Sequence, residues 1–295
     1  MMKDENKTKF MMAKDPVHVG TGGYKLGRVD NTIVREPGTK IPKIPGSTLN
    51  GAARTYTYYH LKENSDKKPN KACALGKKIE GQEPCGNCPI CNNYGFTTES
   101  KSKRSQVNFS DARILFFPVH SMVGPVWITC PSILKDVNIK YNNSIDDLEN
   151  KVITDVTNNK INLGWLYLSV KEEKNPLNDE KISNKIPKKV VDNIVLVSDK
   201  VFSQIINSNL EVRTSVSIDP ETGAAEDGAL FTYEAIPRGT IFWFDIIIQE
   251  GNEIPKEIEK GLEKFETLGV GGMTSRGFGR VKIFKSNNFS GGNND

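Results

Sequence analysis

Alternating and continuous apolar positions divide the chain into predicted strands separated by polar segments. An apolar run bounded by turn residues is typical of a strand in a buried sheet, and strict alternation is typical of a half-buried one. Such patterns occupy residues 8–13, 114–117, 126–130, 240–248 and 281–284. Residues 108–130 therefore predict a strand, a turn and a second strand that belong to the core.

Two stretches have apolar residues at helical spacing. Ser47 follows a Pro-Gly turn as a favourable N-cap, and the apolar stripe behind it is Leu49, Ala52, Ala53 and Tyr56. A second helix is predicted from Pro255 to the glycines of residues 269–272, with an apolar face of Ile254, Ile258, Leu262, Phe265 and Leu268. The N–H groups at the start of the first helix predict a phosphate site, although a capped core helix explains the same residues.

Residues 211–238 predict a long β-hairpin. The first arm alternates Val212, Thr214, Val216 and Ile218 with polar residues, and DPETG at residues 219–223 is a strong turn signal. The returning arm has Phe231 and Tyr233, and Arg213 lies at the root. Such a hairpin suits a wedge between nucleic-acid bases, although an ordinary edge hairpin has the same pattern.

Two polar regions lie outside these elements. Residues 135–189 are rich in Asn, Lys and Glu and predict a polar, solvated insertion, interrupted by a strand-like run at residues 163–170. Residues 286–295 predict a disordered tail.

Charge and length exclude few classes of function. The 295 residues suffice for one large domain or two small ones, and 40 Lys and Arg against 36 Asp and Glu give a net charge of +4, which permits nucleic-acid binding without proving it. Residues 1–10 are charged where a secretory signal is apolar, and the longest apolar run, residues 241–248, is too short to span a bilayer. We expect a cytoplasmic protein without membrane contact.

Four of the five cysteines are crowded into nineteen residues. Their spacing is Cys73-x11-Cys85-x2-Cys88-x2-Cys91, with glycines and prolines between them. Four thiolates at such spacing predict a closed, tetrahedral structural zinc site in an insertion, residues 62–106, that is too small to have its own core. An iron–sulfur cluster is the alternative, because Cys-x2-Cys-x2-Cys is also a ferredoxin spacing, and Cys130 is a distant candidate ligand.

Two glycine-rich runs contain the residues best suited to an anionic ligand. The run from His18 to Arg54 contains Gly22, Gly23, the isolated carboxylate Asp30 and the helix start at Ser47. The run of residues 269–280 combines glycines with two guanidinium groups that suit phosphates, at Gly271, Gly272, Arg276 and Arg280. His18 either forms a local hydrogen bond or helps to place the ligand.

Several of these motifs together resemble a known family over nearly the whole chain. They are VHVG (17–20), GRVDNTIVRE (27–36), IPGSTLNGAAR (44–54), FSDARILFFPVHSMVGPVWITC (109–130), IDPETGAAEDGALFTYEAIPRG (218–239) and GVGGMTSRGFGRV (269–281). In these residues the chain resembles the RAMP-superfamily backbone subunits of CRISPR Cmr (type III-B) effector complexes, and the 109–130 block distinguishes them from their Csm counterparts.

The resemblance implies an α+β fold with a single RRM-like (ferredoxin-like) domain, residues 1–285, that carries the insertions 62–106 and 135–189 and the thumb hairpin 211–238. It implies a subunit that polymerises along CRISPR RNA, joins other Cmr subunits and cleaves guide-paired target RNA at regular intervals. The aspartate of that cleavage maps onto Asp30, with Mg²⁺ or Mn²⁺ as the catalytic cation, and His18 is an accessory candidate.

The residues that we expect to contact RNA are Gly22, Gly23, Ser47, Arg54, Arg213, Phe231, Tyr233, Gly271, Gly272, Arg276 and Arg280. Two other functions stay open. One is a non-catalytic RNA-binding scaffold, in which Asp30 is a turn residue. The other is a protein whose functional centre is the cysteine cluster itself. Two roles stay open for Asp30: it binds the metal, or it accepts the proton of the attacking hydroxyl.

Overall fold

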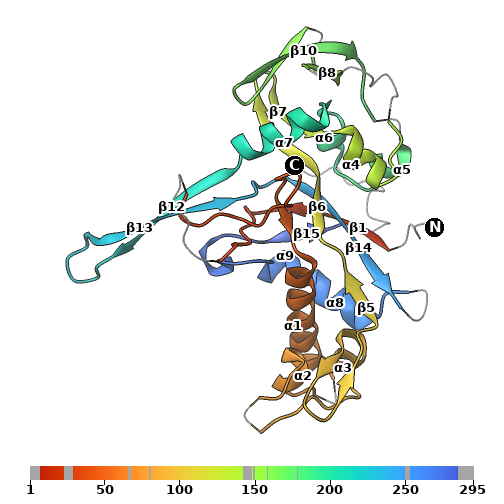
Figure 1. Ribbon diagram of the computed structural model, residues 1–295, viewed down its shortest axis with the longest axis vertical. Coiled ribbons are helices and arrows are strands. Elements are labelled where there is room, and N and C mark those ends of the chain that lie inside the picture. Colours follow the sequence, from red (N-terminus) through yellow and green to blue (C-terminus); the bar gives the residue numbers. More distant parts are fainter. Residues whose placement is uncertain are drawn as a thin grey trace.

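The computed structural model describes residues 7–22, 29–65, 68–79, 81–141, 148, 150–157, 159–177, 179–249 and 253–284, which form a mixed α+β structure. The molecule is elongated, with helix α1 (Gly46–Asn64) and the cysteine-rich insertion at one end and β8–β10 at the other (Figure 1). The β12–β13 hairpin projects sideways between these ends (Figure 1). The predicted α+β class is confirmed.

One large sheet runs through the described residues. Its eleven strands follow the order β15-β1-β14-β6-β7-β11-β8-β10-β9, with β2 paired to β6 and β5 paired to β14. The strands are β1 (Thr8–Ala13), β2 (Lys43–Ile44), β5 (Val107–Phe109), β6 (Ala112–Ser121), β7 (Gly124–Thr129), β8 (Lys151–Thr154), β9 (Lys160–Leu163), β10 (Leu166–Glu173), β11 (Ile194–Leu196), β14 (Ile241–Ile248) and β15 (Val281–Ile283). The predicted pair of strands in residues 108–130 is the β6–β7 hairpin.

Two helices cover one face of this sheet. The chain runs from β1 through α1 to β6, and from β14 through α8 (Lys256–Glu263) to β15. The two helices pack closely, because a Cβ atom on Gly261 of α8 would lie 2.4 Å from Oγ1 of Thr57 in α1. The second predicted helix is interrupted after Glu263, and its last turn is α9 (Phe265–Leu268), which ends at Gly269 with a positive φ of 78°.

Both faces of the central strands are buried. Successive side chains of a strand point to opposite faces, so Met11 and Phe244 lie in the core beneath α1 and α8, whereas Phe10 and Trp243 lie in a second core on the other side. The second core is closed by residues that follow β7, including Leu134, Ile182 and Ile186.

The region predicted as a solvated insertion, residues 135–189, therefore differs from the prediction. It contributes β8, β9 and β10 to the sheet. It also buries apolar side chains, among them Val152, Ile153, Ile161, Leu163 and Leu168. The polar residues that suggested solvation alternate with these apolar ones, and short strands of four residues give too little periodicity for the sequence to reveal them.

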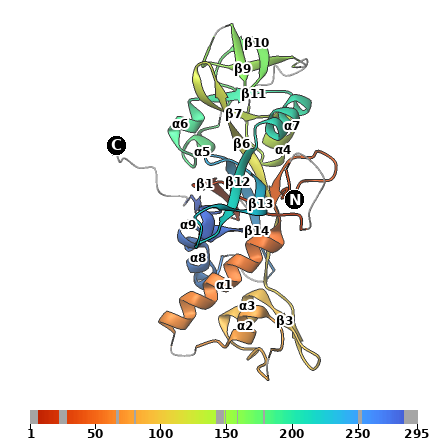
Figure 2. The ribbon, with the colours of Figure 1, turned by 90° about the vertical axis from the view of Figure 1, so that its left-hand side faces the viewer.

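The remaining elements are short or lie outside the main sheet. The helices are α2 (Lys71–Leu75), α3 (Pro89–Tyr94), α4 (Pro131–Asp136), α5 (Glu180–Ser183), α6 (Lys188–Val191), α7 (Asp199–Ser208) and the 3-10 helix η1 (Thr274–Arg276). Strands β3 (Phe96–Thr97) and β4 (Ser102–Lys103) form a small hairpin in the insertion. Figure 2 shows α2, α3 and β3 below the middle of α1.

The predicted long hairpin is confirmed as β12 (Glu211–Ile218) and β13 (Ala225–Ala235). Its register pairs Arg213 with Tyr233 and Ser215 with Phe231. The turn is fixed by Asp219, whose Oδ1 accepts hydrogen bonds from the backbone N–H groups of Glu221 at 2.8 Å and Thr222 at 3.4 Å.

The predicted tail, residues 286–295, lies outside the described residues. Within the residues described above, none of the helices has both the length and the apolar character that a bilayer crossing requires.

Candidate functional site

Asp30 lies at the root of the projecting hairpin, where residues 30–35 run alongside β13. Asn31 bridges Tyr233 in parallel orientation. The backbone N–H of Asn31 donates to the Thr232 carbonyl at 3.0 Å, and the N–H of Glu234 donates to the Asn31 carbonyl at 3.0 Å. Backbone hydrogen bonds next to Asp30 therefore hold this segment against the hairpin.

The Asp30 carboxylate is oriented by one residue, Thr232. Oδ2 of Asp30 accepts hydrogen bonds from the backbone N–H and the Oγ1 hydroxyl of Thr232, both at 2.8 Å, and Oγ1 in turn accepts the N–H of Asp30 at 3.0 Å. These bonds, the backbone one first, lower the pKa of Asp30 below its ordinary value. Among the described residues nothing donates to Oδ1, so Asp30 presents a charged carboxylate with one oxygen open.

His18 lies at the same root, and its Nδ1 and backbone carbonyl are engaged in the fold. Its side chain is buried, Nδ1 donates to the Glu234 carbonyl at 2.6 Å, and its own carbonyl accepts the N–H of Gly272 at 2.8 Å. The edges of Tyr233 and Phe278 pack against the ring, with centroids at 5.9 Å and 6.4 Å. These contacts favour the local hydrogen bond over a role in placing a ligand, and the catalytic assignment of His18 stays a prediction.

A partly buried ion pair at the hairpin root was not predicted. Oε1 of Glu234 accepts from Nη2 of Arg35 at 2.5 Å, and Oε2 accepts the backbone N–H of Ile33 at 3.1 Å. Nε of Arg35 donates to Oδ1 of Asn207 on α7 at 3.0 Å. Glu234 and Arg35 therefore tie the hairpin, residues 30–35 and α7 together. No local signal pairs them, because 199 residues separate the two in sequence.

The loop after α9 contacts the hairpin root, which joins the two glycine-rich runs in space. Arg213 stacks on the Phe278 ring at 4.7 Å and donates from Nη1 to the Gly277 carbonyl at 3.4 Å. Nη1 of Arg276 donates to the Tyr233 hydroxyl at 3.4 Å. Gly271, with a positive φ of 85°, lies against the chain at His18, where a Cβ atom would be 2.5 Å from the His18 carbonyl oxygen. The predicted set Arg213, Tyr233, Gly271, Gly272 and Arg276 is thus brought together.

The exposed apolar face of the hairpin is not the one that carries Phe231 and Tyr233. Directly paired residues of an antiparallel hairpin share a face, so Phe231, Tyr233 and Arg213 lie together, and both aromatic rings are partly buried. The well-exposed apolar side chains belong to the opposite face and are Val212, Val216, Ile218 and Leu230. Leu230, 64 % exposed, is a better candidate wedge than either aromatic residue.

The start of α1 differs from the prediction at Ser47. Pro45 occupies the N-cap position, and Ser47 is an exposed residue inside the first turn. The N–H of Gly46 donates to Oδ1 of Asp111 at 2.8 Å, and Oδ2 of Asp111 forms an ion pair with Lys43 at 2.5 Å. A side chain of the protein itself therefore accepts the Gly46 N–H, and a contact of RNA with Ser47 stays a prediction.

Arg54 and Arg280 are also engaged by the protein. Nε and Nη2 of Arg54 donate to the Cys73 carbonyl at 3.1 Å and 2.7 Å, and Nη2 donates to the Gly95 carbonyl at 2.8 Å. Arg54 thus holds the cysteine-rich insertion against α1, and its contact with RNA stays a prediction. Arg280 forms a bidentate pair with Asp15 at 2.5 Å and 3.0 Å, and this hydrogen bonding lowers the pKa of Asp15.

Only part of the first glycine loop is described. Gly22 is exposed, with a positive φ of 75° and open space around its Cα, and it follows Thr21, whose N–H donates to the Thr32 carbonyl at 3.1 Å. Gly23 lies outside the described residues. A role of Gly22 in binding RNA stays a prediction.

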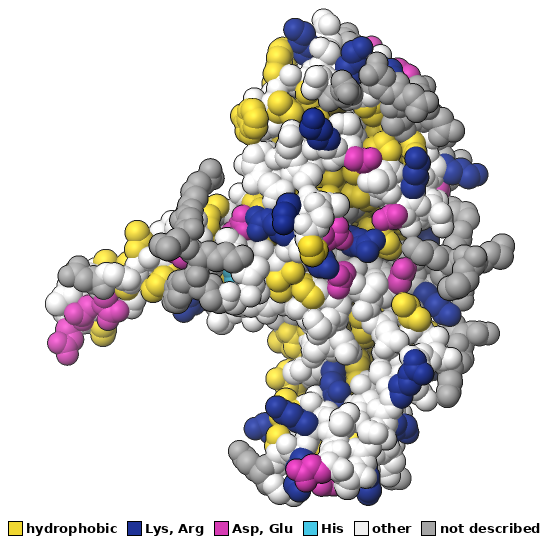
Figure 3. Space-filling model, in the orientation of Figure 1, with side chains coloured by type: hydrophobic (Ala, Val, Ile, Leu, Met, Phe, Trp, Pro, Cys, Tyr) yellow, Lys and Arg dark blue, Asp and Glu magenta, His cyan; other side chains and the backbone are white. Residues whose placement is uncertain are grey.

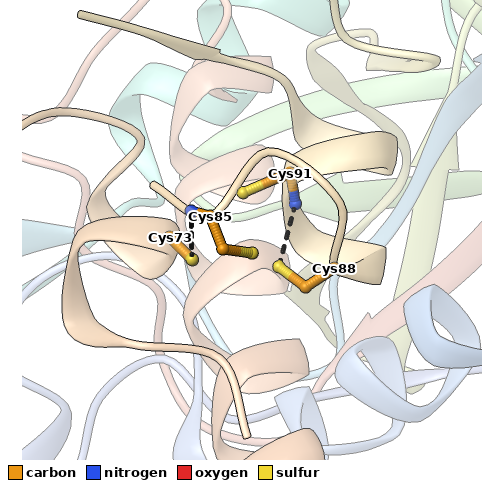
Figure 4. A group of neighbouring side chains, drawn as sticks. All are labelled: Cys73, Cys85, Cys88 and Cys91. Atoms are coloured by element: carbon orange, nitrogen blue, oxygen red, sulfur yellow. Dashed lines mark hydrogen bonds between the residues drawn. The ribbon is translucent and has the colours of Figure 1, made fainter. Parts of the chain in front are cut away.

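The four predicted cysteines converge on one point (Figure 4). Their Sγ atoms all lie within 4.8 Å of one another. A zinc ion with four thiolates at 2.3 Å needs sulfur atoms about 3.8 Å apart, so this group is close to the geometry of a closed site. The fifth cysteine, Cys130, is buried elsewhere and does not belong to the group. The structure therefore contains a possible four-cysteine metal site.

Local bonds and a buried cation support negative charge on these sulfurs. The N–H of Cys85 donates to Sγ of Cys73 at 3.3 Å, and the N–H of Cys91 donates to Sγ of Cys88 at 3.5 Å (Figure 4). Burial raises the pKa of the Cys91 thiol to about 11, so its thiolate needs a neighbouring cation. The guanidinium of Arg54 is near enough to interact electrostatically with Cys91, Cys73 and Cys88.

Comparisons with known proteins agree with this arrangement. The RAMP superfamily model matches residues 11–282. The CRISPR system Cmr endoribonuclease Cmr4 of Pyrococcus furiosus is 28% identical over 293 residues, which cover 91% of each chain. The CRISPR system Cms endoribonuclease Csm3 of Methanothermobacter thermautotrophicus is 26% identical over 150 residues, 47% of this chain and 56% of that protein.

Solved structures show the same fold. A chain in a cryo-EM structure of the type III-B Cmr-beta bound to cognate target RNA has a TM-score of 0.65 at 21% identity, covering 94% of this chain and 96% of that one. Oligomeric Cmr4 from Pyrococcus furiosus has a TM-score of 0.58 at 20% identity, covering 95% and 98%. The resemblance stated from the sequence motifs is confirmed: this chain belongs to the RAMP superfamily.

Proposed function

We propose that this protein is a CRISPR RNA-binding backbone subunit of a type III-B effector complex that cleaves guide-paired target RNA at Asp30. The observation that carries the proposal is the charged Asp30 carboxylate, which Thr232 fixes at the root of the projecting hairpin with one oxygen open. Support comes from relatives that are named endoribonucleases and match 91% and 47% of this chain.

The order of the central elements supports the RRM-like part of the proposal. Antiparallel strands in the order β15-β1-β14-β6, with α1 and α8 as the two crossover helices, have the β-α-β-β-α-β connectivity of a ferredoxin-like domain. The second core buries Phe10 and Trp243 on the sheet face that an RRM uses to stack bases. RNA would therefore bind at the hairpin root and not on the sheet face.

The cleavage chemistry needs little from the protein beyond geometry and charge. RNA carries its own nucleophile, the 2′-hydroxyl, so a site that holds this oxygen in line with the phosphorus gains much of its rate from orientation. The hairpin next to Asp30 is placed to hold a nucleotide out of the stack, with Leu230 and Val216 directly paired on its exposed apolar face. Asp30 would then meet the displaced phosphate at the root of the hairpin.

The lowered pKa of Asp30 favours the metal-binding role over the proton-accepting role. A carboxylate with a depressed pKa is a poor proton acceptor near neutral pH, but it remains a full negative charge for a cation. Oδ1 of Asp30 would hold Mg²⁺ or Mn²⁺, which prefer oxygen ligands. Such an ion, when bound, stabilises charge that develops on the phosphate oxygens.

Replacing Thr232 with valine tests how Asp30 is held. The hydroxyl that donates to Oδ2 is lost while the backbone donor remains, so we expect the pKa of Asp30 to rise towards its ordinary value. The stabilisation of ionised Asp30 is lost as pH falls, so the acid limb of the cleavage pH profile, below about pH 5, should move to higher pH. Thr214→Val, its exposed cross-strand partner, is the control, and equal shifts in both variants would contradict the assignment.

Arg276 is the arginine of the C-terminal loop that remains available for phosphate. Within the described parts of the chain, its guanidinium has one long hydrogen bond, to Tyr233, whereas Arg280 is already paired with Asp15. We expect Arg276→Gln to weaken RNA binding and to reduce the slope of log affinity against log salt by about 0.7–0.9. The double variant Asp15→Asn/Arg280→Gln leaves the net charge unchanged and should keep the slope. A reduced slope in the double variant would show instead that Arg280 grips phosphate.

Binding partners follow from the same proposal. The subunit would bind CRISPR RNA and target RNA, self-associate into a helical filament and join other subunits of the complex. The support is the fold shared with a chain of the Cmr-beta complex bound to target RNA and with oligomeric Cmr4. The four cysteines would hold structural zinc in place of an iron–sulfur cluster, because sulfur atoms within 4.8 Å of one another fit around a single ion and leave little room for a cluster.

A further inference from the structure

We propose that the cysteine-rich insertion is a second RNA-backbone contact, separate from the hairpin root, and not only a metal-stabilised structural element. The proposal rests on the RNA-binding function above and adds a surface to it. Three observations support it: the net positive charge of the protein lies in the insertion, few of the insertion's described cations are paired with carboxylates, and the insertion is held rigidly.

The insertion accounts for the whole net charge of the protein. Residues 62–106 contain nine Lys and Arg and five Asp and Glu, a balance of +4, which equals the +4 of the full chain. The other 250 residues contain 31 of each kind and are neutral overall. A protein whose net charge is confined to 45 residues has a localised basic surface, which is the electrostatic feature that nucleic-acid backbones recognise.

Among the described residues, most of these cations have no carboxylate partner. In the described part of the insertion, Lys78 pairs with Glu83 at 3.7 Å. No carboxylate of the described residues lies within ion-pair distance of the exposed side chains of Lys68, Lys71, Lys77, Lys101 and Arg104. Elsewhere, arginines are commonly neutralised: Arg35 pairs with Glu234, Arg113 with Glu36, and Arg280 with Asp15. Unpaired lysines also lie elsewhere on the described surface, Lys151, Lys188 and Lys189 among them, but the rest of the chain is neutral overall, whereas the insertion has an excess of positive charge.

Three of the free cations lie on adjacent segments. The N–H of Thr97 in β3 donates to the Gly76 carbonyl at 3.0 Å, and β3 pairs with β4. This places Lys77, which follows Gly76, next to the β3–β4 hairpin, where Lys101 and Arg104 flank β4. On the face drawn in Figure 3, Lys and Arg side chains are spread over the end of the molecule that α1 and the insertion form.

The surface is also rigid, which favours binding because little ordering is needed. Arg54 fixes the backbone at Cys73 and Gly95, and the four sulfur atoms draw α2 and α3 together. A zinc ion with four thiolates would carry a charge of −2 at the centre. Three of the four cysteines are buried and lie near Arg54, whereas the lysines point to solvent, so the charge of the site would offset the surface charge only in part.

The chemistry that fits this surface is a chain of phosphates. Exposed, unpaired lysines bind a phosphate backbone by releasing its counterions, without sequence preference. An extended backbone meets several of these cations at once, whereas a single phosphate group would meet one. The backbone could belong to a single strand or to a duplex, and the two are distinguished by comparing RNA probes of equal length.

The test is RNA binding by the full-length protein as a function of salt. In the variant Lys77→Gln/Lys101→Gln/Arg104→Gln we expect weaker binding and a slope of log affinity against log salt that is smaller by about 2, at about 0.7 per phosphate contact for single-stranded RNA. The matched control is Lys151→Gln/Lys188→Gln/Lys189→Gln, which removes the same charge from exposed lysines at the opposite end of the protein. The control should keep the parent slope.

Zinc content and thermal midpoint, unchanged from the parent, would show that the insertion remains folded in the variant. Acetylation of the unmutated protein is a second measurement, in which bound RNA should protect Lys71, Lys77 and Lys101 but not Lys188. If the insertion variant has the same slope of log affinity against log salt as the parent, while Arg276→Gln reduces that slope, this inference is overturned and the proposed function still stands. If the parent protein binds neither probe, the proposed function itself fails. If the insertion variant binds RNA normally but no longer associates with another protein, the surface is a protein contact, and the inference is also overturned.

Discussion

Replacing Asp30 with asparagine is expected to abolish cleavage of guide-paired RNA while leaving RNA binding and folding intact. Asparagine keeps an oxygen that accepts from the N–H and hydroxyl of Thr232, so the shape and hydrogen bonds of the hairpin root are preserved. The substitution removes only the negative charge. Because charge stabilisation by a bound cation is worth several kcal/mol, and about 1.4 kcal/mol is tenfold in rate, we expect cleavage to fall by at least about 100-fold.

The measurement is cleavage of a labelled target RNA by the assembled complex, with binding measured on the same samples. Asp219→Asn is a matched control, because Asp219 is another hairpin aspartate with a lowered pKa, caused first by the Glu221 N–H, but it lies at the turn and not at the root. Its complex should cut like the parent. If both variants lose activity equally, the effect belongs to the hairpin as a whole and not to the Asp30 carboxylate. A scaffold without catalysis would leave Asp30→Asn with no effect at all.

Removal of one cysteine is expected to release zinc and to unfold the insertion. Cys88 suits this test because its Sγ also caps α3 by accepting the N–H of Cys91 at 3.5 Å, and serine can keep that cap. Metal binding contributes on the order of 10 kcal/mol to folding in small zinc modules, so the loss of one of four ligands should unfold the segment. Cys73, Cys88 and Cys91 also belong to the core under α1, so the thermal midpoint of the protein should fall as well.

Elemental analysis and limited proteolysis measure both effects. The parent should contain one zinc per chain and be colourless, and Cys88→Ser should lose the metal and become sensitive to protease within residues 68–106. Cys130→Ala, which changes a buried cysteine outside the group, should keep zinc. Visible absorbance with iron in the parent would identify a cluster instead, and full zinc content in Cys88→Ser would show that Cys88 is not a ligand.

The sequence predicted those features whose signals are local. The alternation from Val212 to Ile218, followed by a DPETG turn, identified the hairpin because both arms and the turn lie within about 25 residues. The cysteines were found for the same reason, since ligand spacing in sequence limits the geometry of a tetrahedral site. The apolar stripe of the first helix was also correct, with Leu49 and Ala53 fully buried.

Predictions failed where a distant residue decides the local structure. Ser47 has the chemistry of an N-cap, but the side chain that bonds the helix start is Asp111, 65 residues after its partner Gly46. Gly46 itself lies against the chain there, because a Cβ atom on it would clash with the Phe109 carbonyl oxygen. Arg54 lies in the helix whose start predicted a phosphate site, but its guanidinium donates to backbone carbonyls of the insertion. Thr232, which orients Asp30, is 202 residues away, and nothing near Asp30 in the sequence indicates it.

The cleavage rate of bound target RNA as a function of Mg²⁺ or Mn²⁺ concentration, in parent and Asp30→Asn complexes, tests most directly whether this carboxylate cuts RNA. For the parent we predict a rate that rises with the cation and saturates. For the variant we predict no cleavage at any concentration, although the target stays bound. Cleavage by Asp30→Asn at the parent rate and with the parent's cation dependence would contradict the assignment of Asp30.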